Sequence, residues 1–432
     1  MCDVKRISLI TFGCSKNLVD SEYLLKQFEG NGFQIEHENV KEGDALIINT
    51  CGFINDAKQE SIETILHYAE QKKAGHIKKL IVMGCLSQRY RDELEKEISE
   101  VDGFFGVDDF PKIIDFLHGT YQSDQQHKRF ISTPGHYSYL KVAEGCNRKC
   151  AFCSIPLIRG EYKSRSFEEL NQEADFLAQL GVKEVNLIAQ DLTYYGYDRY
   201  KKYALPEFLE QIAGKDLFSW IRMLYMYPAQ FPKDVISVMK DYSSICNYLD
   251  IPFQHIDNQL LKQMRRGHTK KQSYELIEFI RRQLPDVTLR TTLMVGHPGE
   301  TEKEFGELLN FVKNVQFDRL GVFTYSEEEQ TYSALNYTDD IPEEVKQERA
   351  DEIMKMQQSI SRSKNSEKIG ATCEVLIDNE DEQYYYARSR ADAPEVDNEI
   401  IIQKNGPVID VGTFQEVEII DAYDYDLVGK IK

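Results

Sequence analysis

The chain has 432 residues, of which 41% are hydrophobic, so it is long enough for about three domains with cores of their own. Its formal net charge of −20 excludes strong nonspecific binding to nucleic acid, because that affinity comes from Lys and Arg, and it favours a basic protein partner. The sequence shows no apolar run of 18 residues, and Met1–Lys16 carries early charges and lacks the long apolar region expected of a signal peptide. We therefore expect a cytoplasmic protein with no membrane span.

Residues 1–119 alternate short apolar runs with helical patterns, which predicts βαβ units and a doubly wound parallel sheet. The expected strands are Arg6–Phe12, Ala45–Asn49 and Lys79–Met83, and the expected helices are Leu18–Glu29, Asp56–Gln71 and Arg91–Ser99. The polar residues 120–135 are interpreted as a linker.

A second β/α series fills residues 136–365 and predicts a partial TIM-type barrel of six strands, which ends in a charged helical stretch, Pro342–Lys368. The expected strands are Tyr139–Ala143, Glu184–Ala189, Ile221–Met226, Asn247–Ile251, Thr288–Val295 and Arg319–Thr324. Residues 366–432 contain short alternating or β-branched runs that predict a small OB-like β-barrel: Cys373–Ile377, Tyr384–Ala387, Glu399–Ile402 and Val417–Ile420.

Six of the nine cysteines form two patterned groups, which favours metal ligation by thiolates over a disulfide framework. Cys146, Cys150 and Cys153 form a CxxxCxxC loop directly after the first strand of the predicted barrel. Three thiolates from one loop can hold three corners of a [4Fe-4S] cluster and leave one iron open. The alternative is a zinc loop, but no nearby Cys or His supplies the fourth ligand at the usual spacing.

This loop, with the aromatic Phe152 before its third cysteine, resembles the radical S-adenosylmethionine superfamily. The resemblance implies that the open iron binds S-adenosylmethionine and that an electron from the cluster cleaves it to a 5′-deoxyadenosyl radical. Five basic residues surround the loop: Arg148, Lys149, Arg159, Lys163 and Arg165. They are candidates for stabilising anionic groups, although most are expected to be solvated.

The second group is Cys14, Cys51 and Cys85, each of which directly follows an apolar strand. Because the ends of parallel strands meet at one edge of a sheet, these cysteines are expected to converge on a second cluster. Gly13, Gly52 and Gly84 are expected to let the backbone approach that cluster. The alternative for any one of these cysteines is an ordinary buried side chain, as expected for Cys2, Cys246 and Cys373.

The order of three-cysteine domain, radical domain and small β-barrel resembles the methylthiotransferase family over essentially the whole chain. The segments Gly13–Glu22 and Asp392–Asp397 resemble its RimO type. The resemblance implies a TRAM-like final domain, two [4Fe-4S] clusters, and methylthiolation of the β-carbon of an aspartate in small-subunit ribosomal protein twelve, near the decoding centre. It also implies an electron donor, a sulfur donor, and a substrate on the assembled or assembling small subunit.

Charge supports a protein substrate independently, since residues 366–432 hold 6 Lys and Arg against 16 Asp and Glu, a net charge of −10. An RNA-binding barrel would be basic, whereas an acidic one steers a basic ribosomal protein. The alternative is an acidic surface that serves solubility alone. Two functional alternatives remain open: a tRNA adenosine methylthiotransferase, and a noncatalytic iron–sulfur electron-transfer protein that docks on ribosomes.

Weaker candidates lie along the strands of the predicted barrel. By the same resemblance, strand ends help to hold S-adenosylmethionine, and the candidates are Gln190, Gln254, His255, Arg290 and Gly296, with Asp191 beside the first. A lone His or Gln there is equally expected to be a structural hydrogen-bonding residue. His297 stands where the family usually has an apolar residue before Pro-Gly-Glu.

Overall fold

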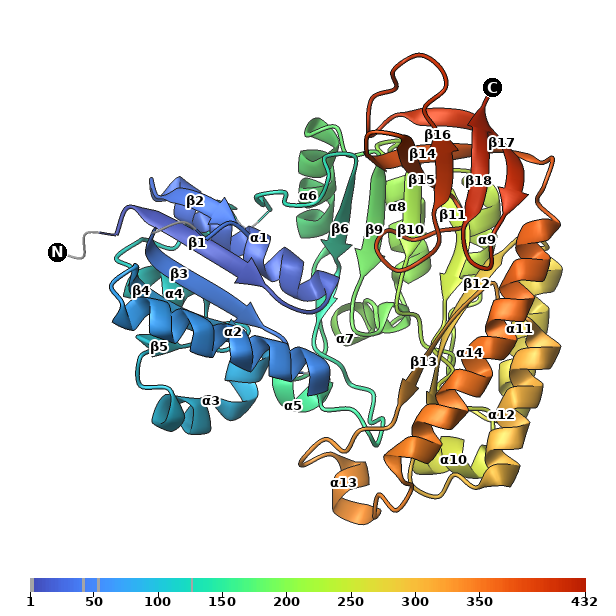
Figure 1. The fold of residues 1–432 in the computed structure, drawn as a ribbon, viewed down its shortest axis with the longest axis horizontal. Helices are drawn as coiled ribbons and strands as arrows, with labels where there is room; N and C mark the ends of the chain where they lie inside the picture. The colour runs from blue at the N-terminus through green and yellow to red at the C-terminus, as the bar shows by residue number, and fades with distance from the viewer. Residues whose placement is uncertain (1–3, 41–42, 53–54, 126) are drawn as a thin grey trace. The chain divides into compact units, whose positions relative to one another are not determined.

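The computed structural model describes residues 4–40, 43–52, 55–125 and 127–432. These residues divide into two compact units. The first comprises the described residues up to Ser132 together with Tyr139–Asn147 and Ser154–Phe176, and the second comprises Thr133–Ser138, Arg148–Cys153 and Leu177–Lys432. Figure 1 gives the order of helices and strands along the chain.

The first unit is built on a five-stranded parallel sheet in the order β2-β1-β3-β4-β5. Its strands are β1 (Arg6–Thr11), β2 (Gln34–His37), β3 (Gly43–Thr50), β4 (Ile77–Gly84) and β5 (Gly103–Phe104), and its helices are α1 (Ser15–Gly30), α2 (Asn55–Lys73), α3 (Cys85–Glu97) and α4 (Phe110–Phe116). The three predicted strands and the three predicted helices are present. The prediction missed the edge strands β2 and β5, and it began α3 six residues too late.

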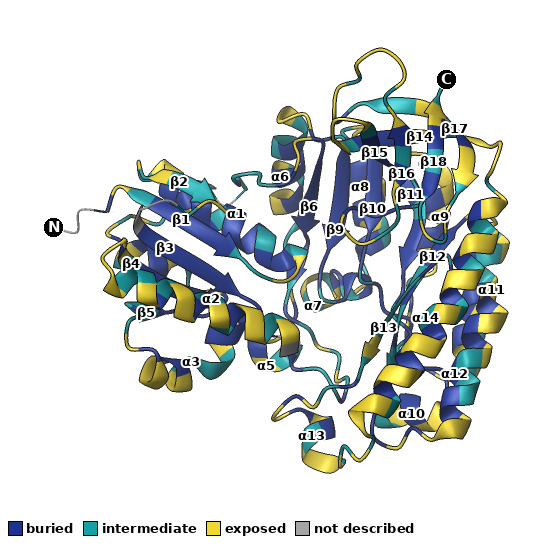
Figure 2. Cartoon of the chain, in the orientation of Figure 1, coloured by how far each residue is buried: buried dark blue, intermediate teal, exposed yellow. Residues whose placement is uncertain are grey.

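Alternate strand residues enter separate cores on the two faces of this sheet, which confirms the doubly wound arrangement. Leu9 and Ile47 pack with Phe28 of α1, whereas Ile48 and Val82 pack in the other core, which includes residues of α2 and α3. Figure 2 shows the central strands buried and the outer faces of the helices exposed.

The predicted linker is not a solvated tether. It contains a short 3₁₀ helix, η1 (Ser123–Gln125), and the fully buried side chain of Arg129. The Arg129 guanidinium lies 2.7 Å from Glu22 and 2.8 Å from Glu173. Arg129 of this segment is therefore buried in the first unit, where its charge is paired, although most of the other described residues of the segment are at least partly exposed.

The central sheet has six strands in the order β13-β12-β11-β10-β9-β6, which confirms the predicted partial barrel. These strands are β6 (Tyr137–Lys141), β9 (Glu184–Ile188), β10 (Trp220–Met223), β11 (Ile245–Asp250), β12 (Thr288–Val295) and β13 (Arg319–Thr324). The connecting elements are β7 (Ala143–Glu144), α5 (Ile155–Arg159), β8 (Lys163–Ser164), α6 (Phe167–Gln179), η2 (Leu192–Tyr194), α7 (Tyr197–Tyr200), α8 (Leu205–Gly214), α9 (Asp234–Asp241), α10 (Asn258–Gln263), α11 (Lys270–Gln283), α12 (Glu302–Val315) and α13 (Tyr332–Asn336).

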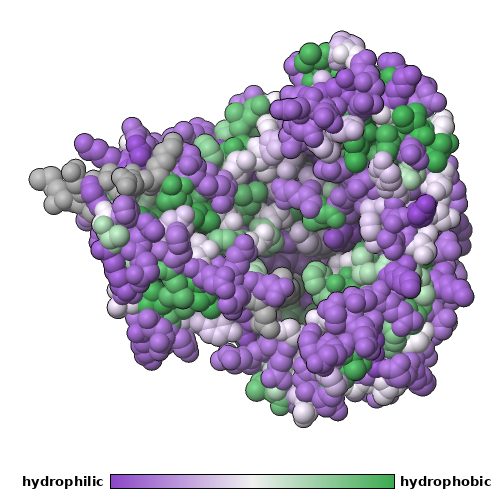
Figure 3. All heavy atoms as spheres, in the orientation of Figure 1, coloured by the Kyte–Doolittle hydropathy of each residue, from purple (hydrophilic) through white to green (hydrophobic). Residues whose placement is uncertain are grey.

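The charged stretch predicted as helical forms α14 (Glu343–Ser366). Hydrophilic side chains predominate over this helix in the face shown in Figure 3. Beyond it lies a closed five-stranded barrel in the order β14-β15-β16-β18-β17, which confirms the expected small β-barrel. Its strands are β14 (Thr372–Glu380), β15 (Tyr384–Ser389), β16 (Ile400–Gln403), β17 (Phe414–Ala422) and β18 (Leu427–Ile431), of which the last was not predicted.

The Asp392–Asp397 segment joins this barrel to the central sheet inside the second unit. Asp392 pairs with Arg319 at the start of β13, and Asp397 accepts a 2.6 Å hydrogen bond from the hydroxyl of Tyr248 on β11. Among the described residues, no helix is long and apolar enough to cross a membrane.

Candidate functional site

Cys14, Cys51 and Cys85 lie at the carboxyl edge of the first sheet, where the sequence places them. They follow β1, β3 and β4, which are neighbouring strands in the sheet, and Cys85 is also the first residue of α3. Cys14 is exposed, whereas Cys51 and Cys85 are buried. Three thiols from adjacent turns, with one of them open to solvent, fit a cluster that must receive a group from outside.

One side chain, Asn17 of α1, contacts all three cysteine-bearing turns. Its Nδ2 donates to the carbonyl oxygens of Phe12 at 2.8 Å and Thr50 at 3.1 Å, which precede Cys14 and Cys51. Its Oδ1 lies 3.6 Å from the Sγ of Cys85. Asn17 is fully buried, so this amide fixes the turns relative to one another.

The glycines beside the cysteines allow the turns to approach one another closely. Gly13 and Gly84 have φ of +93° and +99°, which side-chain-bearing residues rarely adopt. A Cβ on Gly13 would lie 2.9 Å from the Sγ of Cys51, and one on Gly84 would lie 2.4 Å from the Oδ1 of Asn49. Gly13 and Gly84 thus allow the close approach of neighbouring turns, and their role in admitting a cluster stays a prediction.

The electrostatic setting of Cys85 depends on a buried arginine. Burial raises the pKa of the Cys85 thiol to about 11, and the nearby Cys14 and Cys51 add to the rise, while Arg159 opposes it. The Nη2 of Arg159 lies 3.5 Å from the Cys85 sulfur. Because iron binds the thiolate and not the thiol, this guanidinium favours the form of Cys85 that can ligate a cluster.

The CxxxCxxC loop runs from β7 to α5, and backbone hydrogen bonds hold it at several points. The amide of Cys146 donates to Gly160 at 3.1 Å, that of Ala151 donates to Met264 at 2.9 Å, and that of Cys153 donates to Cys150 at 3.2 Å. The three cysteines and Phe152 are partly exposed. Each cysteine of the loop therefore has hydrogen-bonded backbone at or beside it and a partly exposed side chain.

Cys150 also has a buried arginine beside its sulfur. The Nη1 of Arg266 donates to the Cys150 Sγ at 3.1 Å, and the Tyr227 hydroxyl lies 3.6 Å from the same sulfur. Burial disfavours the charge of Arg266, but Cys150 and Tyr227 outweigh that effect and its pKa is raised. A permanent cation at this position stabilises the thiolate, which fits ligation of a [4Fe-4S] cluster.

The expectation that most of the basic residues near the loop are solvated was wrong, because three of the five are in ion pairs. Arg148 Nε lies 2.6 Å from Asp191, and its guanidinium stands 4.2 Å from the ring centre of Tyr227. The other two are Arg159, described above, and Arg165, which lies 2.6 Å from Glu173. Lys149 and Lys163 are exposed.

Four of the weaker candidates lie at the carboxyl ends of the central strands: Gln190, Gln254, His255 and Gly296. Two of them are joined through Glu300. The Glu300 Oε1 accepts the Gly296 amide at 3.0 Å, and its Oε2 lies 3.3 Å from the Nε2 of His255. The Nδ1 of His255 accepts the amide of Asp257 at 3.0 Å, so Nε2 carries the proton toward Glu300.

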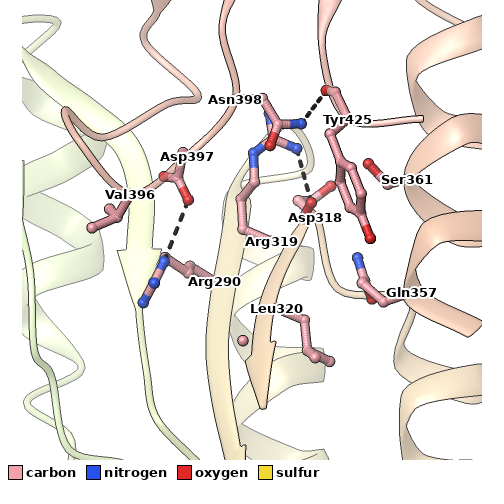
Figure 4. A pocket seen from close by; sticks show the side chains of 11 residues that line it. Arg290, Asp318, Arg319, Leu320, Gln357, Ser361, Val396, Asp397, Asn398 and Tyr425 are labelled. Atoms are coloured by element: carbon pink, nitrogen blue, oxygen red, sulfur yellow. Dashed lines mark hydrogen bonds and ion pairs between the residues drawn. The ribbon is translucent and has the colours of Figure 1, made fainter. Parts of the chain in front are cut away.

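Arg290 lies apart from these candidates, in the amino-terminal half of β12. Its guanidinium is 3.1 Å from Asp250 and 3.3 Å from Asp397 of the C-terminal segment. It lines a cavity of about 210 Å³ between the start of the central strands, α14 and the Asp397 segment (Figure 4). These contacts are those of a residue that joins the barrel to the sheet.

Three family profiles match successive parts of the chain. Residues 6–106 match the uncharacterized protein family UPF0004, residues 140–312 match the radical SAM superfamily, and residues 369–431 match the TRAM domain. The ribosomal protein uS12 methylthiotransferase RimO of Parabacteroides distasonis is 50% identical over 427 residues and covers 99% of both chains. The protein of the same name from Cytophaga hutchinsonii is 47% identical, over 99% of this chain and 98% of its own.

The chain belongs to the RimO family of methylthiotransferases. It is a radical S-adenosylmethionine enzyme.

Solved structures support the fold of this RimO family member but not its chemistry. TsrM from Kitasatospora setae, a radical S-adenosylmethionine methyltransferase, has a TM-score of 0.55 at 12% identity and covers 77% of each chain. The cobalamin-dependent radical enzyme OxsB has a TM-score of 0.52 at 12% identity and covers 83% of this chain and 56% of its own. At that identity the likeness shows the fold alone.

The sequence reasoning missed the residues that surround the sulfurs of this RimO family member. Asn17, Tyr227 and Arg266 were not candidates, and Arg159 was one only as part of a basic neighbourhood. The one available signal for Asn17 was its place three residues after Cys14, in the segment that carries the family resemblance. Arg266 lies more than a hundred residues beyond Cys150, so no local pattern links the two.

Proposed function

We propose that this chain attaches a methylthio group to the β-carbon of an aspartate in ribosomal protein uS12, using two [4Fe-4S] clusters and S-adenosylmethionine. The observation that supports this proposal is the presence of two separate three-cysteine sets, each with a buried arginine on one sulfur. Two sets allow radical generation and sulfur delivery to be carried out by different clusters. A noncatalytic electron carrier would need no open iron at either cluster.

The proposed division of labour follows from the residues at each set. When bound, the loop cluster supplies the electron that cleaves S-adenosylmethionine, and the N-terminal cluster supplies a site for the transferred sulfur. Arg266 holds the Cys150 thiolate in its ligating form, and Asp191 orients Arg148 within the loop. At the other set, Asn17 and Arg159 hold the turns and the Cys85 thiolate.

The charge of the C-terminal barrel supports a basic protein as the substrate. Acidic residues outnumber basic ones by 16 to 6 in residues 366–432, and several of the acidic side chains are exposed, among them Glu382 and Glu416. Such a surface raises the encounter rate with a basic partner and repels a phosphate backbone. We therefore propose that the substrate is met in the cytoplasm, on the small subunit or during its assembly, with a separate electron donor and sulfur donor.

Anaerobic reconstitution with iron and sulfide, followed by incubation with S-adenosylmethionine, reductant and either ribosomal protein or tRNA, tests this proposal. Mass spectrometry should detect a methylthio gain on one aspartate of uS12 and none on tRNA. The Cys373→Ala protein is the matched control, since it loses a thiol of the C-terminal barrel and should stay active. A gain on tRNA alone would overturn the substrate, and no gain on either would overturn the activity.

A further inference from the structure

Arg159 has two edges, and they face different chemical groups. Its Nη1 lies 2.9 Å from the Oδ2 of Asp20 and 2.9 Å from the Oε2 of Glu144. Its Nη2 faces the Cys85 sulfur at 3.5 Å and the amide oxygen of Asn17. The side chain is 1% exposed. An ion pair with the two carboxylates would need only the first edge, so the second edge is left to serve the cysteine site.

The carboxylates do not depend on Arg159 alone. Lys141 pairs with Asp20 and lies 2.7 Å from Glu144, and within the described part of the chain its ammonium pairs with these carboxylates and not with a cysteine. The two cations and two anions form a neutral group in the interior of the first unit. Loss of either cation would leave one uncompensated negative charge there, and only the loss of Arg159 would also remove the contact to sulfur.

The position of Arg159 in the chain ties this contact to the radical loop. Arg159 ends α5, the helix that follows the loop, and Glu144 lies in β7, the strand that precedes it. In α5, Ile158 packs against Cys85 and Val107. Both segments that flank the loop therefore take part in the surroundings of Cys85.

We infer that Arg159 is a positioning residue for the N-terminal cluster, which raises the reduction potential of that cluster through its charge and its hydrogen bond to the Cys85 sulfur. A nearby cation and a donor to a ligating sulfur both stabilise the more negative, reduced cluster. This inference rests on the proposed function only in requiring a cluster on Cys14, Cys51 and Cys85. The contact therefore makes Arg159 a determinant of the potential at which that cluster accepts an electron.

The test uses the full chain with Cys146, Cys150 and Cys153 replaced by alanine, so that only the N-terminal cluster can form. Iron content is measured first, and the reduction potential is then measured by a titration followed by electron paramagnetic resonance. In this background Arg159→Gln should lower the ratio of reduced to oxidised cluster at least tenfold at a fixed potential, a shift of about 59 mV for one electron. Lys141→Gln, which removes the same charge without the contact to sulfur, should shift the potential less than half as far.

An unchanged potential in Arg159→Gln, or equal shifts in the two glutamine variants, would overturn the inference. If Arg159→Gln assembles no cluster, the reduction potential of the Arg159→Lys protein tests the inference instead. Lysine keeps the charge but cannot bridge both carboxylates and the sulfur. A potential below that of the parent then supports the inference, and an equal potential refutes it. A parent protein that binds no iron would instead refute the N-terminal cluster of the proposed function.

Discussion

At the scale of single residues, His297 illustrates how a departure from the family pattern can be accommodated. It is fully buried, and its Nδ1 donates to the carbonyl of Pro298 at 3.1 Å. Its Nε2 accepts from the hydroxyl of Ser333 at 3.0 Å. Burial is the main reason that the pKa of His297 is lowered to about 4, and nearby His255 lowers it further. The ring is thus neutral at physiological pH, as an apolar residue would be.

This pKa predicts a specific dependence of stability on pH. Between pH 6.5 and about 4 the unfolded chain binds a proton at His297 and the folded chain does not, so the free energy of unfolding falls as the pH falls. From pH 7 to pH 5 the loss due to His297 should be about 2 kcal/mol. In urea unfolding, His297→Leu should remove this contribution to the pH dependence of the free energy of unfolding. His67→Leu, at an exposed position, should leave it unchanged. Identical pH dependence in the two variants would contradict the assignment.

The same scale shows what sequence reasoning can reach at the site. The six cysteines could be predicted because their spacing and their place after apolar strands are visible along the chain. Asn17 and Arg266 could not, because their roles depend on hydrogen bonds to residues that only the fold brings near. Arg159 was recognised only as one of five basic residues near the loop, most of which were expected to be solvated, since nothing local shows that Asp20 and Glu144 surround it.

At the scale of elements, strand prediction succeeded where a run of β-branched and apolar residues is long enough to be recognised. β12 and β13 were predicted with their observed bounds because their runs of β-branched and apolar residues stand between clear breaks. Two of the missed strands, β5 and β2, give little sequence signal, because β5 has two residues and β2 has four. Such strands owe their pairing to the neighbouring strand and not to their own sequence.

Another buried carboxylate, Glu184, contributes to the junction of the C-terminal barrel with the central sheet. Glu184 of β9 lies 2.8 Å from Arg222 of β10 and 2.8 Å from Arg388 of β15, and both Glu184 and Arg222 are fully buried. The two arginines outweigh burial and lower the pKa of Glu184. The ion pair between Glu184 and Arg388 therefore joins β9 of the central sheet to β15 of the barrel only while Glu184 is charged.

Glu184→Gln should lower the free energy of unfolding by about 3–5 kcal/mol, because it leaves the buried guanidinium of Arg222 without its anion, while Arg388 keeps its ion pair with Asp378. The midpoint of urea unfolding measures this loss. Glu382→Gln makes the same chemical change at an exposed position of the C-terminal barrel and should lower the free energy of unfolding by less than about 0.5 kcal/mol. Comparable midpoints in the two variants would show that the junction does not depend on this ion pair.

At the scale of the whole molecule, the chain combines two cysteine sets with an acidic final domain, and the proposed function requires the two sets to act separately. Cys51 and Cys150 are suitable probes because each belongs to one set alone. Cys51 forms no part of the CxxxCxxC loop, so its loss should leave the loop cluster intact. Cys150 carries the contact to Arg266, so its loss removes the ligand whose thiolate form that arginine stabilises.

The two variants are therefore expected to differ in kind. Cys51→Ala should still cleave S-adenosylmethionine to 5′-deoxyadenosine within about twofold of the parent, yet transfer no methylthio group, because only the sulfur site is damaged. Cys150→Ala should lose both activities. Chromatography of 5′-deoxyadenosine and mass spectrometry of uS12 from the same reactions measure the two outcomes together, with Cys373→Ala as the control for loss of an uninvolved thiol. Methylthiolated uS12 from the Cys51→Ala protein would mean that one cluster performs both steps, and the division of labour between the two sets would have to be abandoned.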